Sequence, residues 1–266
     1  MKHFISSWGI MLLFAVSLSF VFDACKENVP QTSIDPYQHI SDPDVKKILI
    51  AAIEKSGGLD NWNNKTFLRF KKDFTLHEES GAIEKAVIET HSYQYQPEEE
   101  IRISWEQDSL QHQLTYRQGK VEKTVNGRID KNTNTQSLQN TVLSATYVIS
   151  IPFKLLDKGV LLTYEGLENL EDGQEVAVIR GEFNPDLHEN HSTPDIWWYY
   201  FDPSDYKLVA YMVKHADHYS YVKNERFTMV NGFLFPKERK SYRVDEQRNI
   251  LYLRAAYVYE EMEDEQ

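Results

Sequence analysis

The stretch Leu68–Leu76, LRFKKDFTL, sets the fold class, because the hydropathy of the chain takes on a period of two residues there. Apolar side chains alternate with charged or polar ones, which is the pattern of a β-strand with one buried face. Ser80-Gly81 supplies a turn, and a second strand is expected over Ala82–Tyr95. Because a short turn joins antiparallel neighbours, the stretch predicts the first hairpin of an antiparallel sheet.

The same alternation recurs towards the C-terminus, between short turns such as Pro203–Asp205 and Asn231-Gly232. We therefore predict a meander of roughly ten antiparallel strands. Twist keeps such a sheet from staying flat, so it should curl into an unclosed half-barrel, mainly β with helices (α+β). The further strands are expected at Ile101–Trp105, Leu114–Tyr116, Val121–Val125, Val160–Glu165, Glu175–Phe183, Ile196–Asp202, Leu208–His215, His218–Val230, Phe233–Val244 and Ile250–Glu260.

Two segments have helical rather than strand periodicity. The first begins at Ser41–Asp44, with Ser41 as the expected N-cap, and ends at Gly57-Gly58. The second lies between Gln136 and Asp157, where the alternation is lost, and includes a short helix within Pro152–Gly159. We expect these helices to cover the open side of the curled sheet as a lid, which leaves a concave apolar face lined by aromatic side chains.

Composition narrows the class of protein. The 266 residues include 13 phenylalanines, 16 tyrosines and five tryptophans, too many aromatics for a disordered chain. The single cysteine excludes an internal disulfide framework and a CxxC metal site. With 29 basic and 41 acidic residues the net charge is −12, which disfavours a general nucleic-acid-binding protein.

The N-terminal segment has the composition of a bacterial lipoprotein leader. A basic start is followed by the uncharged apolar run Phe4–Phe22, then by Ala24 and Cys25. This order predicts a signal peptide over residues 1–24 and a lipid anchor on Cys25. An uncleaved membrane anchor and release by an ordinary signal peptidase are the alternatives.

The rest of the chain divides into a tether and one domain. Residues 25–43 contain three prolines and little apolar periodicity, as expected of a flexible tether behind the lipidated cysteine. Residues 44–266 show no repeat, linker or break in composition and are expected to form a single domain.

Four segments carry a resemblance to a known family: Ser56–Trp62, Ile151–Asp157, Tyr199–Pro203 and Val230–Pro236. Together they resemble the LolA/LolB-like lipoprotein carriers, in particular an uncharacterised envelope-lipoprotein branch of that superfamily. The resemblance implies an unclosed barrel with a helical lid over an apolar cavity for acyl chains. It also implies an outer-membrane lipoprotein of a Gram-negative envelope, facing the periplasm or the cell surface. The segments are turns, caps and packing motifs, so no functional residue of the carriers transfers.

The run Ile196–Phe201, IWWYYF, is aromatic on both faces of its strand. One face should join the core, and the other should line a cavity or lie beneath a helix. We expect that cavity to bind an acyl chain, a lipid or a lipoprotein. An ordinary filled core is the alternative, and the protein would then act through protein contacts. The candidate ligand-binding residues are Phe70, Phe74, Trp105, Phe153, Leu156, Trp197, Tyr199, Phe201 and Met212.

Catalytic and metal motifs are weak. GxSxG, HExxH and a glycine-rich phosphate loop are missing, and the carboxylate pair Glu165/Glu168 has no supporting context. We therefore predict no enzyme and no cofactor, with a metal-binding hydrolase as a distant alternative. A hairpin at Pro203–Asp205 would bring His215 close to residue 195. The weak metal candidates are His188, His191, His215 and His218.

Overall fold

The computed structural model describes residues 35–184, 186–187 and 195–265. The chain divides into two units, Met1–Asp35 and Pro36–Gln266, and all elements below belong to the second unit. The expectations for the leader, for Cys25 and for His188 and His191 fall outside the described residues, so the division into leader, tether and domain stays a prediction. Among the described helices, none is both long and apolar enough to cross a membrane.

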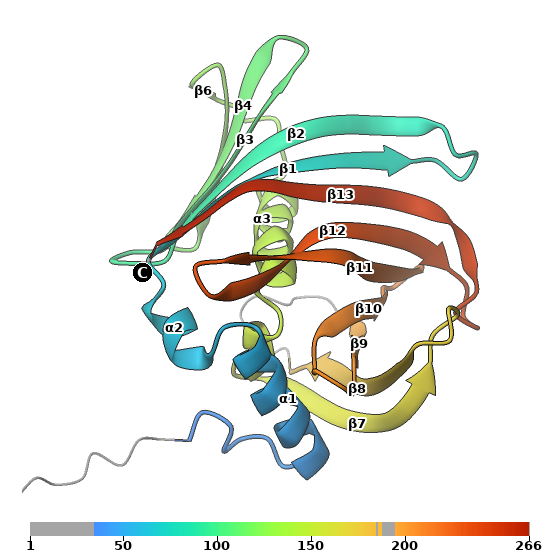
Figure 1. Ribbon diagram of the computed structural model, residues 1–266. Coiled ribbons are helices and arrows are strands. Elements are labelled where there is room, and N and C mark those ends of the chain that lie inside the picture. The colour runs from blue at the N-terminus through green and yellow to red at the C-terminus, as the bar shows by residue number, and fades with distance from the viewer. Residues whose placement is uncertain (1–34, 185, 188–194, 266) are drawn as a thin grey trace, which may run out of the picture. The chain divides into compact units, whose positions relative to one another are not determined.

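Thirteen strands form one antiparallel sheet in the order β6-β5-β4-β3-β2-β1-β13-β12-β11-β10-β9-β8-β7. The first and last strands of the sequence, β1 and β13, pair in its middle, and β6 and β7 lie at its two edges. The sheet curls without closing (Figure 1), which confirms the predicted half-barrel. The strands are β1 (Phe67–His77), β2 (Ile83–Gln94), β3 (Glu100–Gln107), β4 (Leu110–Arg117), β5 (Lys120–Val125), β6 (Arg128–Ile129), β7 (Val160–Asn169), β8 (Glu175–Phe183), β9 (Ile196–Phe201), β10 (Leu208–Lys214), β11 (Tyr219–Val230), β12 (Phe233–Val244) and β13 (Ile250–Glu265).

The expected count of roughly ten strands was too low, although the segments named from the sequence correspond to every strand except β6. Strand β6 covers only two residues, which cannot show an alternating pattern. It follows a tight turn in which Asn126 and Gly127 both have positive φ angles, of 48° and 72°. Such a turn matches the twist of a hairpin and returns the chain to β5 for one short ladder.

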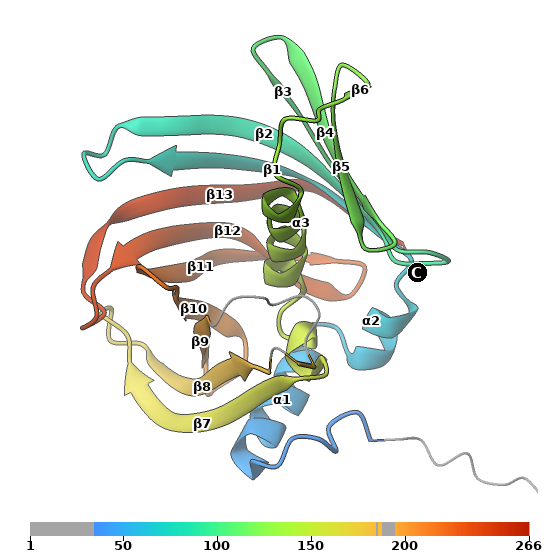
Figure 2. The same ribbon diagram turned by 180° about the vertical axis from the view of Figure 1, so that it is seen from behind.

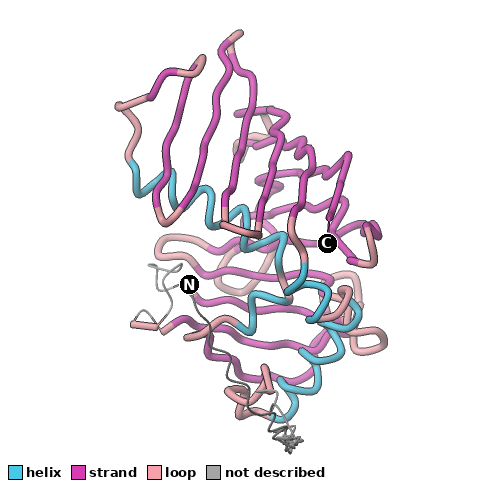
Figure 3. The backbone as a smooth tube through the Cα atoms, turned by 90° about the vertical axis from the view of Figure 1, so that its left-hand side faces the viewer, coloured by secondary structure: helices cyan, strands magenta, loops and turns pink. Residues whose placement is uncertain are grey.

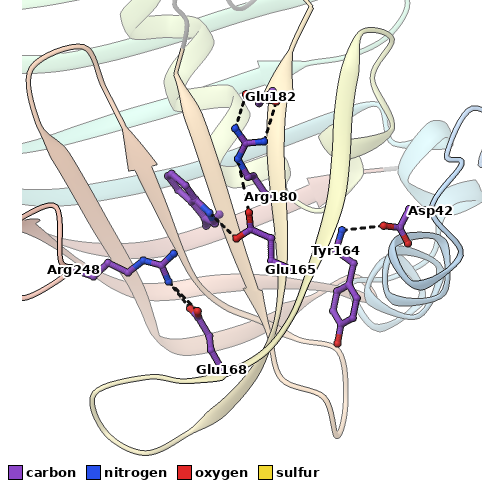
Figure 4. Close-up of polar contacts among 8 residues, drawn as sticks. Asp42, Tyr164, Glu165, Glu168, Arg180, Glu182 and Arg248 are labelled. Carbon is purple, nitrogen blue, oxygen red and sulfur yellow. Dashed lines mark hydrogen bonds and ion pairs between the residues drawn. The ribbon is translucent and has the colours of Figure 1, made fainter.

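Helix α1 (Pro43–Lys55) buries the predicted apolar stripe, but its N-cap is Asp42 rather than Ser41. Asp42 Oδ1 accepts from the backbone N–H of Asp44 at 3.0 Å and of Val45 at 3.3 Å. Its other oxygen accepts from the N–H of Tyr164 on the edge strand β7, at 3.0 Å (Figure 4). The Tyr164 hydrogen bond is the main cause that lowers the pKa of Asp42. One carboxylate thus ties the start of α1 to the edge of the sheet. A serine side chain has one oxygen, so it lacks the second carboxylate oxygen that bonds Tyr164.

Helix α2 (Leu59–Asn64) was not expected, and it brings three of the family-like segments together. Trp62 stacks on Phe153 with ring centroids 4.2 Å apart and meets Phe233 edge-on at 5.8 Å. Gly57 approaches the β11–β12 turn so closely that a Cβ there would lie 2.6 Å from the Phe233 ring. These segments therefore share one packing cluster, consistent with a structural role for the motifs.

Helix α3 (Thr135–Ser150) and the 3-10 helix η1 (Phe153–Leu156) form the second helical region, as predicted. Figures 2 and 3 show α3 lying across the concave face of the sheet. The main hydrophobic core lies between the helices and this face. A second, smaller cluster fills the opposite face of β8 to β12, around Val178, Tyr200 and Met212.

Candidate functional site

The C-terminal half of helix α3 is fastened to the sheet by polar and aromatic contacts. The hydroxyl oxygens of Tyr147 and Tyr199 are 2.6 Å apart, and Arg239 on β12 donates from Nη1 to the carbonyl of Val148 at 3.3 Å. Trp197 meets Tyr147 at a steep angle, with ring centroids 5.1 Å apart. These contacts fix the helix above the sheet, and a cavity opens on each side of it.

The larger cavity has a volume of about 510 Å³ and lies between α3 and the inner face of the sheet. We call it the basic cavity, because four cationic side chains and one carboxylate line it. Its wall is otherwise aromatic and aliphatic. The lining residues are Phe70, Lys72, Phe74, Lys85, Glu89, His91, Tyr93, Ile103, Trp105, Leu114, Lys123, Leu138, Thr141, Ser144, Ala145, Val148, Tyr211, Arg239, Tyr257 and Tyr259.

A chain of polar contacts crosses the floor of the basic cavity. Glu89 on β2 contacts Lys72 Nζ at 2.5 Å and His91 Nε2 at 3.0 Å. His91 Nδ1 lies 2.8 Å from the hydroxyl of Tyr93. An ionised carboxylate can only accept, so the ring proton belongs on Nε2, and Nδ1 accepts from the tyrosine. This assignment gives each polar atom of the histidine a partner inside the core.

Burial and pairing set the charges of Glu89 and His91 in this chain of polar contacts. Burial lowers the pKa of His91 to about 4, against the opposing effect of Glu89. Burial also acts to raise the pKa of Glu89, but the His91 hydrogen bond and the Lys72 charge outweigh it, and the pKa falls to about 2. At neutral pH the histidine is therefore neutral while Glu89 carries its charge.

Arg239 lies beneath α3 and is only 3% exposed. Its guanidinium carbon lies 4.8 Å from the ring centroid of Tyr259 and 5.5 Å from that of Tyr257, within cation–π range. Nη1 donates to Val148, whereas Nε is buried without a hydrogen-bond partner among the described residues. The side chain therefore keeps an unused donor beside the basic cavity.

The other cavity, of about 420 Å³, lies between α3 and strands β9 to β12. We call it the acidic cavity, because Glu99, Asp157 and Asp195 line it together with a single lysine, Lys154. Lys154 pairs with Asp157 at 2.8 Å. Its aromatic lining includes Tyr116, Tyr147, Trp197 and Tyr211. Three residues border both cavities, namely Ser144, Val148 and Tyr211.

The nine predicted ligand-binding residues are distributed over several sites. Phe70, Phe74 and Trp105 line the basic cavity, and Trp197 lines the acidic one. The remaining residues on this side of the sheet belong to the core or pack against it, namely Phe153, Leu156, Tyr199 and Phe201. Met212 lies on the opposite face of the sheet, because it pairs with Trp198 rather than Trp197. The face of β9 that carries Trp197, Tyr199 and Phe201 is thus the one beneath the helix.

A third pocket, of about 410 Å³, is formed on the opposite face and includes Met212, Tyr200, Tyr221 and Tyr242. We call it the outer pocket. At its border Arg248 donates to both carboxylate oxygens of Glu168, at 2.8 and 2.9 Å (Figure 4).

The candidate carboxylate pair Glu165/Glu168 is divided between two separate contacts (Figure 4), and only Glu168 lines the outer pocket. Glu165 accepts a hydrogen bond from Trp198 Nε1 at 3.0 Å, whereas Glu168 accepts from Arg248. Arg180 on β8 binds Glu182 of the same strand through both terminal nitrogens, at 3.0 and 2.7 Å, and its Nε lies 3.9 Å from Glu165 Oε1. The contacts of Glu165 and Glu168 fasten the edge strand β7 to the rest of the sheet.

The histidine candidates are only partly brought together. His215 Nδ1 lies 3.0 Å from Asp195 Oδ2, which confirms the proximity expected from the hairpin. The His218 ring lies 4.5 Å from the His215 ring, and His218 bonds Asp217 at 2.6 Å. Within the part of the chain that the structure describes, no group of three or more His, Cys, Asp or Glu residues could hold a metal ion.

Sequence reasoning missed the polar residues of the basic cavity. One signal was present, because Lys72 takes the inward position between Phe70 and Phe74 in the alternating stretch. An inward lysine in such a pattern indicates a buried charge and therefore a buried partner. That partner, Glu89, lies opposite Lys72 on β2, and the pairing depends on the register of the two strands.

Comparisons with known proteins bear on the fold. No family model matches the chain, and no curated protein matches it in sequence. Among solved structures, a DUF1329 family protein from Desulfovibrio piger is similar with a TM-score of 0.53 and 9% identity, covering 84% of this chain and 93% of that one.

Two further solved structures are similar over most of the chain. A putative outer membrane lipoprotein-sorting protein domain from Vibrio parahaemolyticus has a TM-score of 0.52 and 7% identity, covering 83% of this chain and 93% of its own. A LolA superfamily protein from Nitrosomonas europaea has a TM-score of 0.52 and 8% identity, covering 82% of this chain and 92% of its own. The chain therefore has a LolA-like fold.

Proposed function

We propose that the protein is a non-catalytic binding module of the cell envelope whose half-barrel takes an acyl chain of a lipid or lipoprotein beneath α3. The observation that carries this proposal is the pair of cavities, of about 510 and 420 Å³, on either side of that helix. Volumes of this size are usual for small-ligand sites. The likeness in fold to an outer membrane lipoprotein-sorting protein domain supports the same class of ligand.

Binding would be driven by removing the acyl chain from water, at ~0.8 kcal/mol per buried methylene. Phe70 and Trp105 offer apolar surface in the basic cavity, and Trp197 offers it in the acidic cavity. Transfer needs no reaction, because the chain passes to whichever partner buries it more completely. The proposal includes a lipid anchor on Cys25 that holds the protein at the outer membrane, facing the periplasm or the cell surface.

Photo-crosslinking in cells tests the proposal on the full chain. Cells that express the protein are fed a fatty acid carrying a diazirine and an alkyne, irradiated, and the labelled peptides are identified by mass spectrometry. We expect labelling of peptides that contain Trp105 or Trp197. The experiment is repeated with Cys25→Ser, so that acyl chains attached to the protein's own anchor are not counted.

Three variants of α3 provide the controls. Ala145→Trp fills the basic cavity and Leu143→Trp fills the acidic one, so each should remove the labels of its own cavity. Gln139→Trp lies on the same helix but lines neither cavity, and it should leave both sets of labels unchanged. If the folded wild-type protein carries no label on the peptides that line either cavity, the proposal is contradicted. It would favour instead a filled-core lipoprotein that acts through protein contacts.

A further inference from the structure

We propose that the basic cavity selects acyl chains that end in an anionic head group, with Arg239 and Lys85 as the residues that bind the anion. This inference rests on the proposed function, because it concerns the same cavity and the same class of ligand. It adds a chemical criterion, a negative charge on the head, that distinguishes the ligand from neutral lipids. Carboxylate and phosphate heads share this chemistry.

The charges of the basic cavity do not balance. Its four cations face a single carboxylate, Glu89, which is already occupied by Lys72 and His91. Lys123 pairs with Asp130 at 3.0 Å. No carboxylate among the described residues pairs with either remaining cation, Arg239 or Lys85. In a protein with a net charge of −12, this surplus of positive charge in one cavity is local and specific.

The unused donor of Arg239 gives the anion a defined place. A guanidinium presents Nε and a terminal nitrogen as a fork that matches a carboxylate or phosphate. In Arg239, Nη1 is committed to the Val148 carbonyl, but Nε is buried and has no partner among the described residues. A buried donor without an acceptor is costly, so a turn of the guanidinium that brings Nε to an anionic oxygen in the cavity would be favoured.

Lys85 lines the same cavity from β2. Arg239 stands opposite Tyr257 in the β12–β13 register, and Tyr257 stands opposite Phe74 in the β13–β1 register. Lys85 Nζ lies 5.4 Å from the ring of Phe74. The two cations therefore flank one stacked aromatic pair, Phe74 and Tyr257, whose ring centroids are 6.2 Å apart. The charges of Arg239 and Lys85 also both act to lower the pKa of Lys72, consistent with a shared positive field.

The acyl tail has a separate apolar wall. Ile103 and Leu114 face the cavity from β3 and β4, and Leu138 and Ala145 face it from α3. Strands β3 and β4 are on the β2 side of β1, whereas β12 is on the other side, next to β13. A head at Arg239 and a tail along these aliphatic residues would therefore run across the sheet beneath the helix. The acidic cavity offers no such cation pair, because Lys154 is its single lysine and already binds Asp157.

A photoaffinity titration of the full chain, held in an amphipathic polymer, tests the inference. The probes are diazirine derivatives of hexadecanoic acid, hexadecyl phosphate and hexadecan-1-ol, and labelled peptides are mapped by mass spectrometry. We expect hexadecanoate to label the basic cavity at a concentration about tenfold lower than the alcohol, as a charge-assisted hydrogen bond would give. The phosphate probe shows which head is preferred, and preference for either anion supports the inference.

Substitutions locate the selectivity. Arg239→Gln should reduce the preference for the anion over the alcohol to about twofold or less, and Arg239→Lys should retain part of it. Lys85→Gln, at a half-buried position, provides an independent variant if Arg239→Gln does not fold, and it should weaken hexadecanoate but not the alcohol. The matched control is Lys158→Gln, which removes the same charge from an exposed residue outside the cavity.

The outcomes separate the two proposals. Binding of none of the three probes would overturn the proposed function and this inference together. Equal binding of the alcohol and both anions would overturn the inference and leave the proposed function standing. An anion preference that survives both Arg239→Gln and Lys85→Gln, or labelling confined to the acidic cavity, would also overturn the inference.

Discussion

The two cavities beside α3 have similar volumes and share Ser144, Val148 and Tyr211, but their charges are opposite. In the basic cavity the cations stand on strands, inside the sheet. In the acidic cavity the carboxylates follow η1, precede β9 or lie in the β2–β3 connection. The side chains of the Lys72–Glu89 pair are 15% and 13% exposed, whereas those of Lys154 and Asp157 are 29% and 30% exposed.

This difference separates two uses of charge. The carboxylates of Asp157 and Glu99 are partly or fully exposed, so they stay hydrated and bias which ligands approach the acidic cavity. Cations fixed inside the sheet lose water on folding and interact strongly with whatever enters. An uncharged acyl chain would find apolar surface in either cavity. The buried cations of the basic cavity are therefore the feature that would determine which cavity a ligand with a charged head binds.

The largest expected effect concerns the two ion pairs. Glu89→Gln should cost about 3 to 5 kcal/mol of unfolding free energy, because it leaves the charge of Lys72 buried without its partner. Asp157→Asn removes the corresponding acid of the acidic cavity and should cost about 1 kcal/mol or less, since that pair is more hydrated. Denaturant titration of both variants measures the contrast, and equal losses would show that the two cavities do not differ in this way.

The sequence predicted the strands well because each buries one face, and the alternation in Leu68–Leu76 records that fact locally. The N-cap of α1 was placed one residue too early, since the second oxygen of Asp42 bonds Tyr164, a residue 122 positions away. The undercount of strands has a similar origin in β6, which is too short to carry a pattern.

The candidate site was predicted only in its aromatic part. Large aromatic residues such as Trp105 and Trp197 can be recognised from the local sequence alone, and both line cavities. The polar part depends on which strands become neighbours. Glu89 meets Lys72 through the β1–β2 register, and Arg239 reaches the same cavity because β12 and β1 both pair with β13. Such contacts between distant segments leave no periodic signal in the sequence.

The pH dependence of stability should come from the basic cavity. The pKa of His91 is lowered from 6.5 to about 4 in the folded chain, so the unfolded chain binds the additional proton between these values. Stability should therefore fall as the pH drops from about 6.5 to 4, by on the order of 3 kcal/mol. Below about 4.5, protonation of Glu89 in the unfolded chain adds a further loss, because its folded pKa is about 2.

Unfolding free energies measured between pH 7 and pH 4 test this assignment. His91→Gln should flatten the profile above pH 4.5, whereas His39→Gln, at an exposed position, should follow the wild type. A profile for His91→Gln as steep as that of the wild type would show that the proton is taken up elsewhere.

The smallest expected effect concerns the helix that separates the cavities. Tyr147→Phe and Tyr199→Phe each remove one of the two hydroxyls that lie 2.6 Å apart. Each substitution should lower the free energy of unfolding by about 1 kcal/mol. In a double-mutant cycle the second substitution should cost less than the first, because the shared bond is already lost. Hydrogen exchange should rise in the C-terminal half of α3 more than in the strands. Strictly additive losses with unchanged exchange would mean that Arg239 and the aromatic packing, rather than this hydrogen bond, hold α3 between the two cavities.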